Sequence, residues 1–372
     1  MRIALTHPTA WPEVHRGSER LLHDLAAHHA AAGHEVTIVT TTPAAPGADP
    51  PGVARQVLPR RPWAWGRMLH FHHGFAWDLP QALREGGFDV VHTLNHHDAA
   101  AAAWARRGGA RFRLVHQCTG IPRARIWRRL PLEGLVFRAA VRGADAVVVI
   151  SRCAEAFLAK DYGRQAVLLP APVATGDFAR IPKPAPDAQR PRLLFTGDAA
   201  EPRKGAALLV RAFVRLRATH PDLVLTFAGP TPPATAAALR ALAGDAATAL
   251  EVIAAKAEDL PRLYAEASVT VNPAVWEAFG MVLVESLAAG TPVVGCDHAG
   301  TRDIVTNPAV GRLFAPGPIR GHAPTDDTAL AEALDGALRL SRMRTTALDC
   351  RAHAEAFSWT SLGAGYSAVL TE

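Results

Sequence analysis

Short apolar runs alternate along this chain with longer segments in which apolar positions recur every three or four residues. The runs predict buried strands of parallel sheets, and the periodic segments predict helices that cross from one strand to the next. We expect strands at 2–6, 35–40, 53–58, 89–94, 111–117, 144–150 and 165–169, and then at 192–197, 223–229, 250–255, 268–271 and 311–316. This alternation predicts the α/β class, with two Rossmann-like, doubly wound sheets.

A polar break separates the two series of strands. Residues 180–191 read RIPKPAPDAQRP, and such a Pro-rich polar segment is typical of a linker. With 372 residues the chain is long enough for two domains that each bury a core. We therefore predict an N-terminal domain over 1–175, a linker over 176–191 and a C-terminal domain over 192–350.

Composition narrows the class of protein. Hydrophobic residues make up 49% and charged residues 20% of the chain, as in soluble globular proteins, and no apolar run approaches the ~20 residues that span a bilayer, so we expect a cytoplasmic protein. The four cysteines are widely scattered and form no C-x-x-C pair, so neither a disulfide framework nor a zinc site is indicated. The net charge of +6 suits an anionic small substrate or peripheral contact with anionic lipid at the inner membrane face, and no motif indicates nucleic acid.

The segment 272–301 carries the clearest chemistry. A strand ends at its start, and a helix follows that begins near 280–282 and stops at Gly290. The unpaired N–H groups at that helix start favour an anion such as a diphosphate. Glu285 lies about 7 Å further along the helix, where its carboxylate would accept hydrogen bonds from a ribose. Glu277 precedes the helix, on the side of a sugar attached to the diphosphate; the plainer alternative is that both glutamates are simply solvent-exposed.

The same segment resembles the E-x7-E motif of the retaining glycosyltransferases of family 4, which have the GT-B fold. The matching residues are Glu277-Ala278-Phe279-Gly280, Glu285-Ser286-Leu287-Ala288-Ala289-Gly290-Thr291-Pro292-Val293-Val294 and Ala299-Gly300-Thr301-Arg302-Asp303-Ile304-Val305. The resemblance implies that Glu277 contacts the sugar hydroxyls and that Glu285 binds the ribose. It implies that the sugar and phosphate are held by Phe279, Gly280, Met281 and Val282.

The resemblance also implies an arrangement of the whole chain. Two Rossmann-like domains would face a cleft, with the nucleotide-sugar mostly on the second domain and the acceptor mostly on the first. The segment 351–372 resembles the terminal helix that packs back on the N-terminal domain in GT-B proteins. Members of the family generally need no bound metal, so the nucleotide-sugar is expected as a co-substrate and no cofactor is expected.

Further donor contacts follow from the same resemblance. Lys204 matches the lysine that relatives place on the donor diphosphate, and it is predicted to be catalytic together with Glu277. Asp198 stands where relatives have an arginine, and Arg203 is our hypothesis for the missing guanidinium.

Two donor contacts are less complete. Relatives carry a Gly-Gly pair against the diphosphate after the first strand, and this chain keeps only Gly17. Lys256, which follows the strand at 250–255, is a candidate neighbour of the nucleobase.

The acceptor side is predicted from histidines. His96 and His97 follow the strand at 89–94 and are expected to bind an acceptor hydroxyl, since a neutral imidazole can hydrogen-bond one. Relatives often have a histidine near the reacting sugar where this chain has Thr119, so either His116 or a loop histidine substitutes, or catalysis does without one. Together with His70, His72, His73 and His92, these histidines are also candidates for a metal site. No carboxylate or cysteine accompanies them at a recognised spacing, so we expect no metal.

Two stretches of the sequence fit more than one interpretation. Residues 60–77 are dense in Trp, Phe, His and Arg, which fits a core helix, an acceptor-binding wall or an amphipathic membrane surface; we favour the first two together. Residues 123–129, RARIWRR, fit either contact with anionic lipid or a phosphorylated acceptor, or simply a solvated helix face.

The predicted activity is transfer of a sugar from a UDP- or GDP-sugar to a hydroxyl of a small natural product, glycolipid or glycan, with retention at the anomeric carbon. A GT-B sugar-nucleotide epimerase is one alternative, and a non-catalytic sugar-nucleotide-binding protein is another. A dehydrogenase is disfavoured because no G-x-G-x-x-G follows the first strand.

Overall fold

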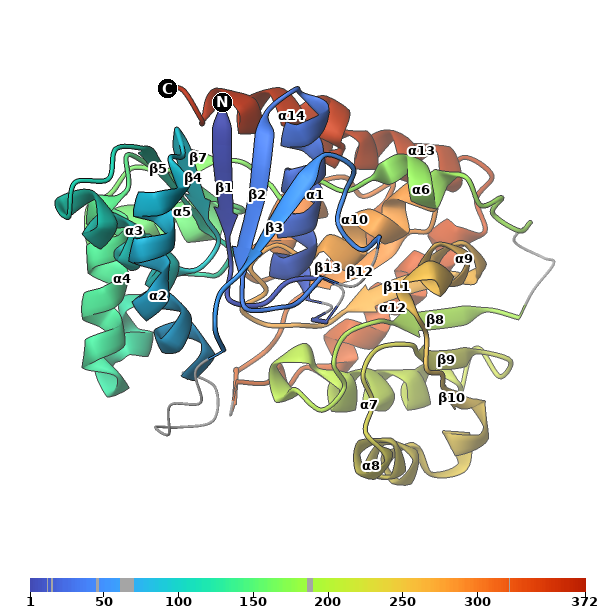
Figure 1. Ribbon diagram of the computed structural model, residues 1–372. Coiled ribbons are helices and arrows are strands. Elements are labelled where there is room, and N and C mark those ends of the chain that lie inside the picture. The colour runs from blue at the N-terminus through green and yellow to red at the C-terminus, as the bar shows by residue number, and fades with distance from the viewer. Residues whose placement is uncertain (12, 15, 45–46, 61–69, 186–189, 321) are drawn as a thin grey trace. The chain divides into compact units, whose positions relative to one another are not determined.

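A computed structural model describes residues 1–372 except 12, 15, 45–46, 61–69, 186–189 and 321 (Figure 1). The chain divides into two compact units, one formed by Met1–Ala171 with Leu362–Glu372 and the other by Pro172–Ser361. Each unit contains a parallel sheet with helices between most successive strands, so the predicted α/β class is confirmed. None of the helices in the described residues has a stretch that is both long and apolar enough to cross a membrane.

The first unit is built on a seven-stranded sheet in the order β3-β2-β1-β4-β5-β6-β7. Its strands are β1 (Arg2–Thr6), β2 (Glu35–Thr40), β3 (Val53–Val57), β4 (Val90–Thr93), β5 (Arg113–Cys118), β6 (Ala146–Val149) and β7 (Val167–Leu168). Its helices are α1 (Gly17–Ala31), α2 (His70–Gly86), α3 (His96–Arg107), α4 (Pro131–Gly143), which follows the 3₁₀ helix η1 (Ala124–Arg129), and α5 (Arg152–Tyr162). The sheet order reverses between β1 and β4, which makes the carboxyl ends of these two strands the expected place for a ligand.

The second unit is built on a six-stranded sheet in the order β10-β9-β8-β11-β12-β13, the Rossmann order. Its strands are β8 (Arg192–Phe195), β9 (Val224–Phe227), β10 (Leu250–Val252), β11 (Val269–Asn272), β12 (Val293–Cys296) and β13 (Gly311–Phe314). Its helices are α6 (Thr175–Ala179), α7 (Ala206–Leu216), α8 (Pro233–Ala243), α9 (Leu260–Glu266), α10 (Met281–Ala288), α11 (Thr301–Ile304), α12 (Asp327–Ser341) and α13 (Thr346–Ala354). Here the order reverses between β8 and β11, which pair in parallel.

The segment predicted as a linker, 176–191, is not a plain linker in its first residues. Helix α6 buries Phe178 to 2% exposure, with its ring centroid 5.9 Å from that of Tyr264 in α9. Lys183 then donates to the carbonyl oxygens of Ala265 and Ala267, at 3.0 and 2.7 Å. The second unit begins at Pro172, so the described residues of this segment belong to it. The contacts of Phe178 and Lys183 fix the segment to that unit.

The chain ends in helix α14 (Trp359–Ala368), of which the residues from Leu362 onward belong to the first unit. The hydroxyl of Tyr366 donates to the carbonyl oxygens of Leu169 and Pro170, and the His28 ring lies 3.1 Å from the carbonyl oxygen of Gly363. Within the predicted segment 351–372, residues up to Ser361 are assigned to the second unit. Of the aromatic stretch 60–77, residues 61–69 lie outside the described part, and α2 begins at His70.

Candidate functional site

Two loops of the second unit meet at the point where its strand order reverses. Arg203 and Lys204 lie in the loop after β8, and Glu277 lies in the loop after β11. Because β8 and β11 are parallel neighbours, with Leu193 opposite Val269, the loops that follow them emerge at the same sheet edge. The sheet topology therefore brings together side chains that are more than seventy residues apart in the chain.

Glu277 forms the centre of this site. Its Oε2 lies 2.6 Å from Lys204 Nζ and 3.5 Å from an Arg203 guanidinium nitrogen. The side chain is only 15% exposed, and burial alone would raise its pKa; the cations of Lys204 and Arg203 outweigh burial and lower the pKa of Glu277. The carboxylate is therefore ionised at neutral pH, and the structure brings together the two residues predicted to be catalytic, with Arg203 beside them.

Gly280 sets the entry to helix α10. Its φ of 105° lies in the region that favours glycine, and a Cβ there would lie 3.6 Å from Glu277 Cγ. Met281 and Val282 begin the helix and are half-buried, so the open N–H groups of its first turn lie next to Glu277. Phe279 is buried, and its ring packs edge-on to that of Phe357. A ligand could therefore contact the backbone of Phe279 but not its ring.

Glu285 lies inside the second unit. It is 4% exposed, and its Oε2 accepts a hydrogen bond of 2.8 Å from the hydroxyl of Tyr264, which is itself fully buried. Thr196, just after β8, lies 3.3 Å from the same hydroxyl. The alternative that Glu277 and Glu285 are ordinary exposed glutamates is therefore wrong, and Tyr264 is a positioning residue that sequence reasoning missed.

The loop before α10 is held by a second loop, after β12. The backbone N–H of Trp276 donates to the His298 ring at 3.1 Å, and that of Gly300 donates to the Glu277 carbonyl oxygen at 2.9 Å. Trp276 and Ala299 have φ of 55° and 54°, a conformation that is costly for residues with a side chain. Such backbone strain gathers at functional sites, and nothing in the amino-acid pattern signals it here.

Three other residues were singled out by the resemblance: Gly17, Lys256 and Asp198. Gly17 begins α1 in the first unit, and its contact with a donor stays a prediction. Lys256 is exposed, and its ammonium lies 3.6 Å from Glu258. Asp198 is exposed too, and its carboxylate accepts a hydrogen bond from the backbone N–H of Ala200 at 2.9 Å, so it stabilises the local turn.

The first unit holds a cavity of about 340 Å³ at the carboxyl ends of β4 and β5. Among the residues that line it are His96, His116 and Thr119, so the structure brings three of the four predicted acceptor residues together. Burial lowers the pKa of His116 to about 3, which keeps its imidazole neutral and able to hydrogen-bond a hydroxyl. His97 is not among the lining residues of this described cavity; it turns instead toward Glu133 of α4, with Nε2 2.9 Å from Oε2.

Comparison with protein families identifies both halves of the chain. Residues 190–339 match the profile of the family described as "Glycosyl transferases group 1", and residues 15–177 match that of "Glycosyltransferase Family 4". The two matches together include all of the predicted site residues of both units.

Individual relatives give a similar result. The chain is 29% identical over 358 residues to a phosphatidyl-myo-inositol mannosyltransferase of Mycolicibacterium smegmatis, covering 92% of this chain and 86% of the relative. It is 32% identical over 232 residues to a GDP-mannose-dependent alpha-(1-6)-phosphatidylinositol monomannoside mannosyltransferase of the same organism, covering 56% and 58% of the two chains. A sucrose-phosphate synthase structure from Thermosynechococcus elongatus superposes with a TM-score of 0.82 at 23% identity, over 99% of this chain and 98% of that one, which shows a shared fold.

Proposed function

Because the chain belongs to the family 4 glycosyltransferases and has the GT-B fold, we propose that it moves a sugar from a nucleotide diphosphate to an acceptor hydroxyl with retention of anomeric configuration. The observation that carries this proposal is the placement of Glu277, paired with Lys204 at 2.6 Å and adjacent to the N-terminus of α10. A carboxylate for the sugar, a cation for the diphosphate and a helix start for the phosphate oxygens then share one sheet edge.

In this proposal the positive groups stabilise the leaving diphosphate. Lys204, Arg203 and the first N–H groups of α10 would lie against the charge that develops as the bond to the sugar breaks. The acceptor would attack from the face that the diphosphate leaves, and the diphosphate would take the acceptor's proton. Glu285 does not serve as the second carboxylate of a double displacement, because it is buried and hydrogen-bonded to Tyr264. These cations do the work that a metal bound at the diphosphate would otherwise do.

The donor that we propose to test first is GDP-mannose, with UDP-sugars as the alternative. The support is that one relative is named as a GDP-mannose-dependent mannosyltransferase. The side chains at the site are compatible with this choice and do not select a base, since Lys256 is exposed and offers no specific base contact.

The acceptor that we propose is an inositol-bearing lipid, and a small natural product or a glycan is the alternative. Two relatives carry phosphatidylinositol in their names. The first unit also exposes apolar side chains among arginines at the start of α4, which suits a peripheral contact with anionic lipid. We call this the η1–α4 surface; it consists of Arg125, Ile126, Arg128, Leu130, Leu132 and Leu135.

Donor binding is tested by thermal unfolding with GDP, UDP, ADP and TDP and their common sugars. A nucleotide at a hundred times its Kd should stabilise the fold by about 2.7 kcal/mol, which raises Tm by several degrees. In Glu285→Ala the shift should shrink, since hydrogen bonds to a charged group contribute about 1.5–3 kcal/mol. Glu332→Ala, an exposed glutamate of α12, is the matched control and should keep the full shift. A wild type that responds to no nucleotide would contradict the proposed donor site.

Membrane contact is tested on the η1–α4 surface. Leu132 and Leu135 are 75% and 63% exposed, and burying a leucine in lipid contributes about 1.5–3 kcal/mol. The double variant Leu132→Glu, Leu135→Glu should therefore lose at least about tenfold in affinity for vesicles that contain phosphatidylinositol, measured by co-sedimentation. Leu348→Glu replaces a leucine of similar exposure in α13 and should bind as the wild type does. Equal binding by all three proteins would remove this surface from the proposal.

A product search separates the remaining alternatives. An epimerase would convert or release the sugar of the donor without any acceptor, whereas a transferase needs the acceptor for its main product. A non-catalytic protein would bind the nucleotide in the thermal test and turn over neither substrate, and its biological output would survive Glu277→Ala.

A further inference from the structure

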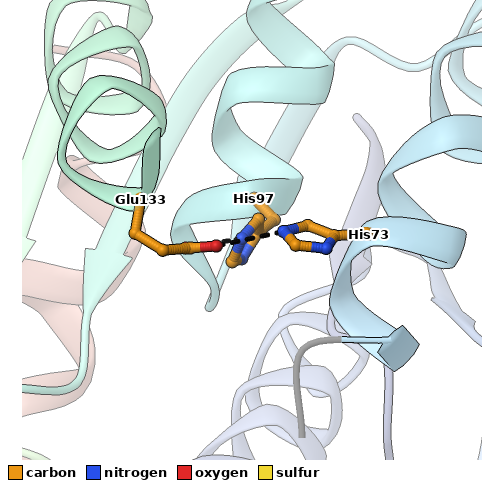
Figure 2. A group of neighbouring side chains, drawn as sticks. All are labelled: His73, His97 and Glu133. Atoms are coloured by element: carbon orange, nitrogen blue, oxygen red, sulfur yellow. Dashed lines mark hydrogen bonds and ion pairs between the residues drawn. The ribbon is translucent and has the colours of Figure 1, made fainter. Parts of the chain in front are cut away.

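Four histidines and one glutamate meet at the carboxyl edge of the first sheet. They come from three neighbouring helices: His72 and His73 from α2, His96 and His97 from the first turn of α3, and Glu133 from the first turn of α4. Figure 2 shows the side chains of His73, His97 and Glu133 pointing toward one another. In the described part of the chain, these three form the one group of metal-ligating side chains whose ligand atoms all lie within 4.8 Å of one another.

The distances suit a shared ion. Glu133 Oε1 lies 3.1 Å from His73 Nε2, and Glu133 Oε2 lies 2.9 Å from His97 Nε2. Two atoms that each bind Zn²⁺ at about 2.0–2.1 Å with tetrahedral angles lie about 3.3 Å apart. These two separations are close to that value, and one ligand atom from each of the three side chains lies within 4.8 Å of the other two.

The hydrogen bonds of Asn95 fix which nitrogen of His97 is free to act as a ligand. Asn95 Oδ1 accepts from the backbone N–H of His97 at 2.9 Å, which sets the orientation of the amide, since a backbone N–H can only donate. The same oxygen lies 3.1 Å from His97 Nδ1, so that nitrogen carries the proton. In that tautomer Nε2 carries no proton and is the nitrogen that lies near Glu133. A second group that orients a metal-binding histidine in this way is typical of metal sites.

His97 Nε2 has no hydrogen-bond partner, although its ring is buried to 4% exposure. It lies close to Glu133 Oε2 but without the alignment of a hydrogen bond. A buried nitrogen lone pair against a carboxylate oxygen is unfavourable unless a proton or a cation lies between them. Glu133 itself is paired, since Oε1 lies 3.1 Å from His73 Nε2 and Oε2 lies 3.3 Å from His96 Nε2, so the unpartnered atom of the group is His97 Nε2.

We propose that His73, His97 and Glu133 bind one divalent transition-metal ion of the Zn²⁺ class, beside the cavity that His96 lines. Two imidazoles and one carboxylate form the ligand set of open zinc sites, whereas Mg²⁺ and Ca²⁺ prefer sites made of oxygen ligands alone. The bound ion would tie α2 to the first turns of α3 and α4. This site is separate from the proposed sugar transfer, and its test does not require activity.

The experiment uses the full chain with any affinity tag removed, stripped with a chelator and titrated with Zn²⁺. We expect one tightly bound Zn²⁺ per chain, a rise in Tm on binding, and, with Co²⁺ instead, the visible absorption of a tetrahedral site. Mg²⁺ should produce none of these. Binding should weaken at least tenfold in His73→Ala and in Glu133→Gln.

The choice of variants guards against misfolding. The His73 side chain is 46% exposed, so His73→Ala removes a ligand without opening the core. His220→Ala is the matched control, because this histidine also lies 2.9 Å from a carboxylate oxygen, that of Asp335, but in the described part of the chain it belongs to no group of three metal-ligating side chains. It should bind Zn²⁺ as the wild type does. No tight binding by the wild type, or unchanged binding by both His73→Ala and Glu133→Gln, would overturn the proposal.

Discussion

Glu277→Gln and Lys204→Met are each expected to reduce kcat/KM by about 10²- to 10³-fold, the loss typical when one group that stabilises a transition state is removed. Gln keeps the shape of the glutamate but removes its charge, and Met keeps much of the lysine stem but removes the ammonium. Because Lys204 Nζ lies 2.6 Å from Glu277 Oε2, each substitution also leaves its partner without its closest counter-charge. Steady-state kinetics with the donor identified by thermal shift will measure both effects.

The double variant distinguishes a functional pair from two independent contacts. Groups that act as a unit are not additive, so Glu277→Gln with Lys204→Met should lose far less than the product of the two single losses. Arg262 and Glu266 provide a matched control, since they form an ion pair of 2.9 Å on the surface of α9. Arg262→Met and Glu266→Gln should change kcat/KM less than twofold, because exposed pairs contribute about 0–1 kcal/mol to stability and lie outside the proposed chemistry.

Two outcomes would count against this assignment. If both single variants keep wild-type kcat/KM, the pair has no part in the reaction. If the losses appear only together with a large fall in Tm, the pair is a structural contact of the loops after β8 and β11. Arg203, 3.5 Å from Glu277 Oε2, will moderate the structural effect in Lys204→Met, since it leaves the carboxylate one cation.

The fold could be predicted from the sequence because its signals are local. Each predicted apolar run between turn residues corresponds to a strand. The predicted bounds match in full at β1 and β2, and at the other strands they differ from the observed bounds by only a few residues. The first residues of the segment predicted as a linker form helix α6, and there is a physical reason why the sequence pattern did not indicate it. The prolines and charged residues of the segment indicate only that it is polar. The position of α6 depends instead on the burial of a single residue, Phe178.

The candidate site of the second unit was predicted only in part. Glu277 and Gly280 belong to one contiguous motif, and Lys204 belongs to a turn with a recognisable pattern. The structure brings these three residues together. Tyr264 was not predicted, because a tyrosine in an amphipathic helix looks like any core residue until its hydroxyl is found on Glu285. The strained backbone of Trp276 has no signature in the amino-acid pattern at all.

The histidine cluster shows a different limit of sequence reasoning. Metal motifs are recognised by the spacing of ligands on one element, and by that test the histidines lack a carboxylate. Glu133 is supplied by another helix, 36 residues after His97, and only the packing of α3 on α4 reveals it. The expectation of no metal rested on the resemblance to the family and on spacing, and spacing cannot exclude a site assembled from three helices.

Gly300→Ala is expected to be the most damaging single-methyl change in the second unit's site. A Cβ at this position would lie 2.1 Å from the carbonyl oxygen of Ala278 and 2.9 Å from the Cα of Phe279, and backbone atoms cannot move aside as a flexible side chain can. The loop that carries Glu277 must therefore shift, and its hydrogen bond from the Gly300 N–H to the Glu277 carbonyl oxygen must stretch. We expect a loss of about 1–3 kcal/mol in the free energy of unfolding, measured by denaturant titration.

Activity should fall by more than stability explains. A displacement of about 1 Å in a group that positions the substrate costs about 10²-fold in rate, so kcat/KM of folded Gly300→Ala should fall by that order. Gly176→Ala is the matched control: an added Cβ meets nothing within 4 Å there, and alanine is the better helix former in α6. It should leave activity unchanged and stability equal or slightly higher. Full activity in Gly300→Ala would mean that the loop before α10 tolerates the shift, and the position of Glu277 would then not be what limits the reaction.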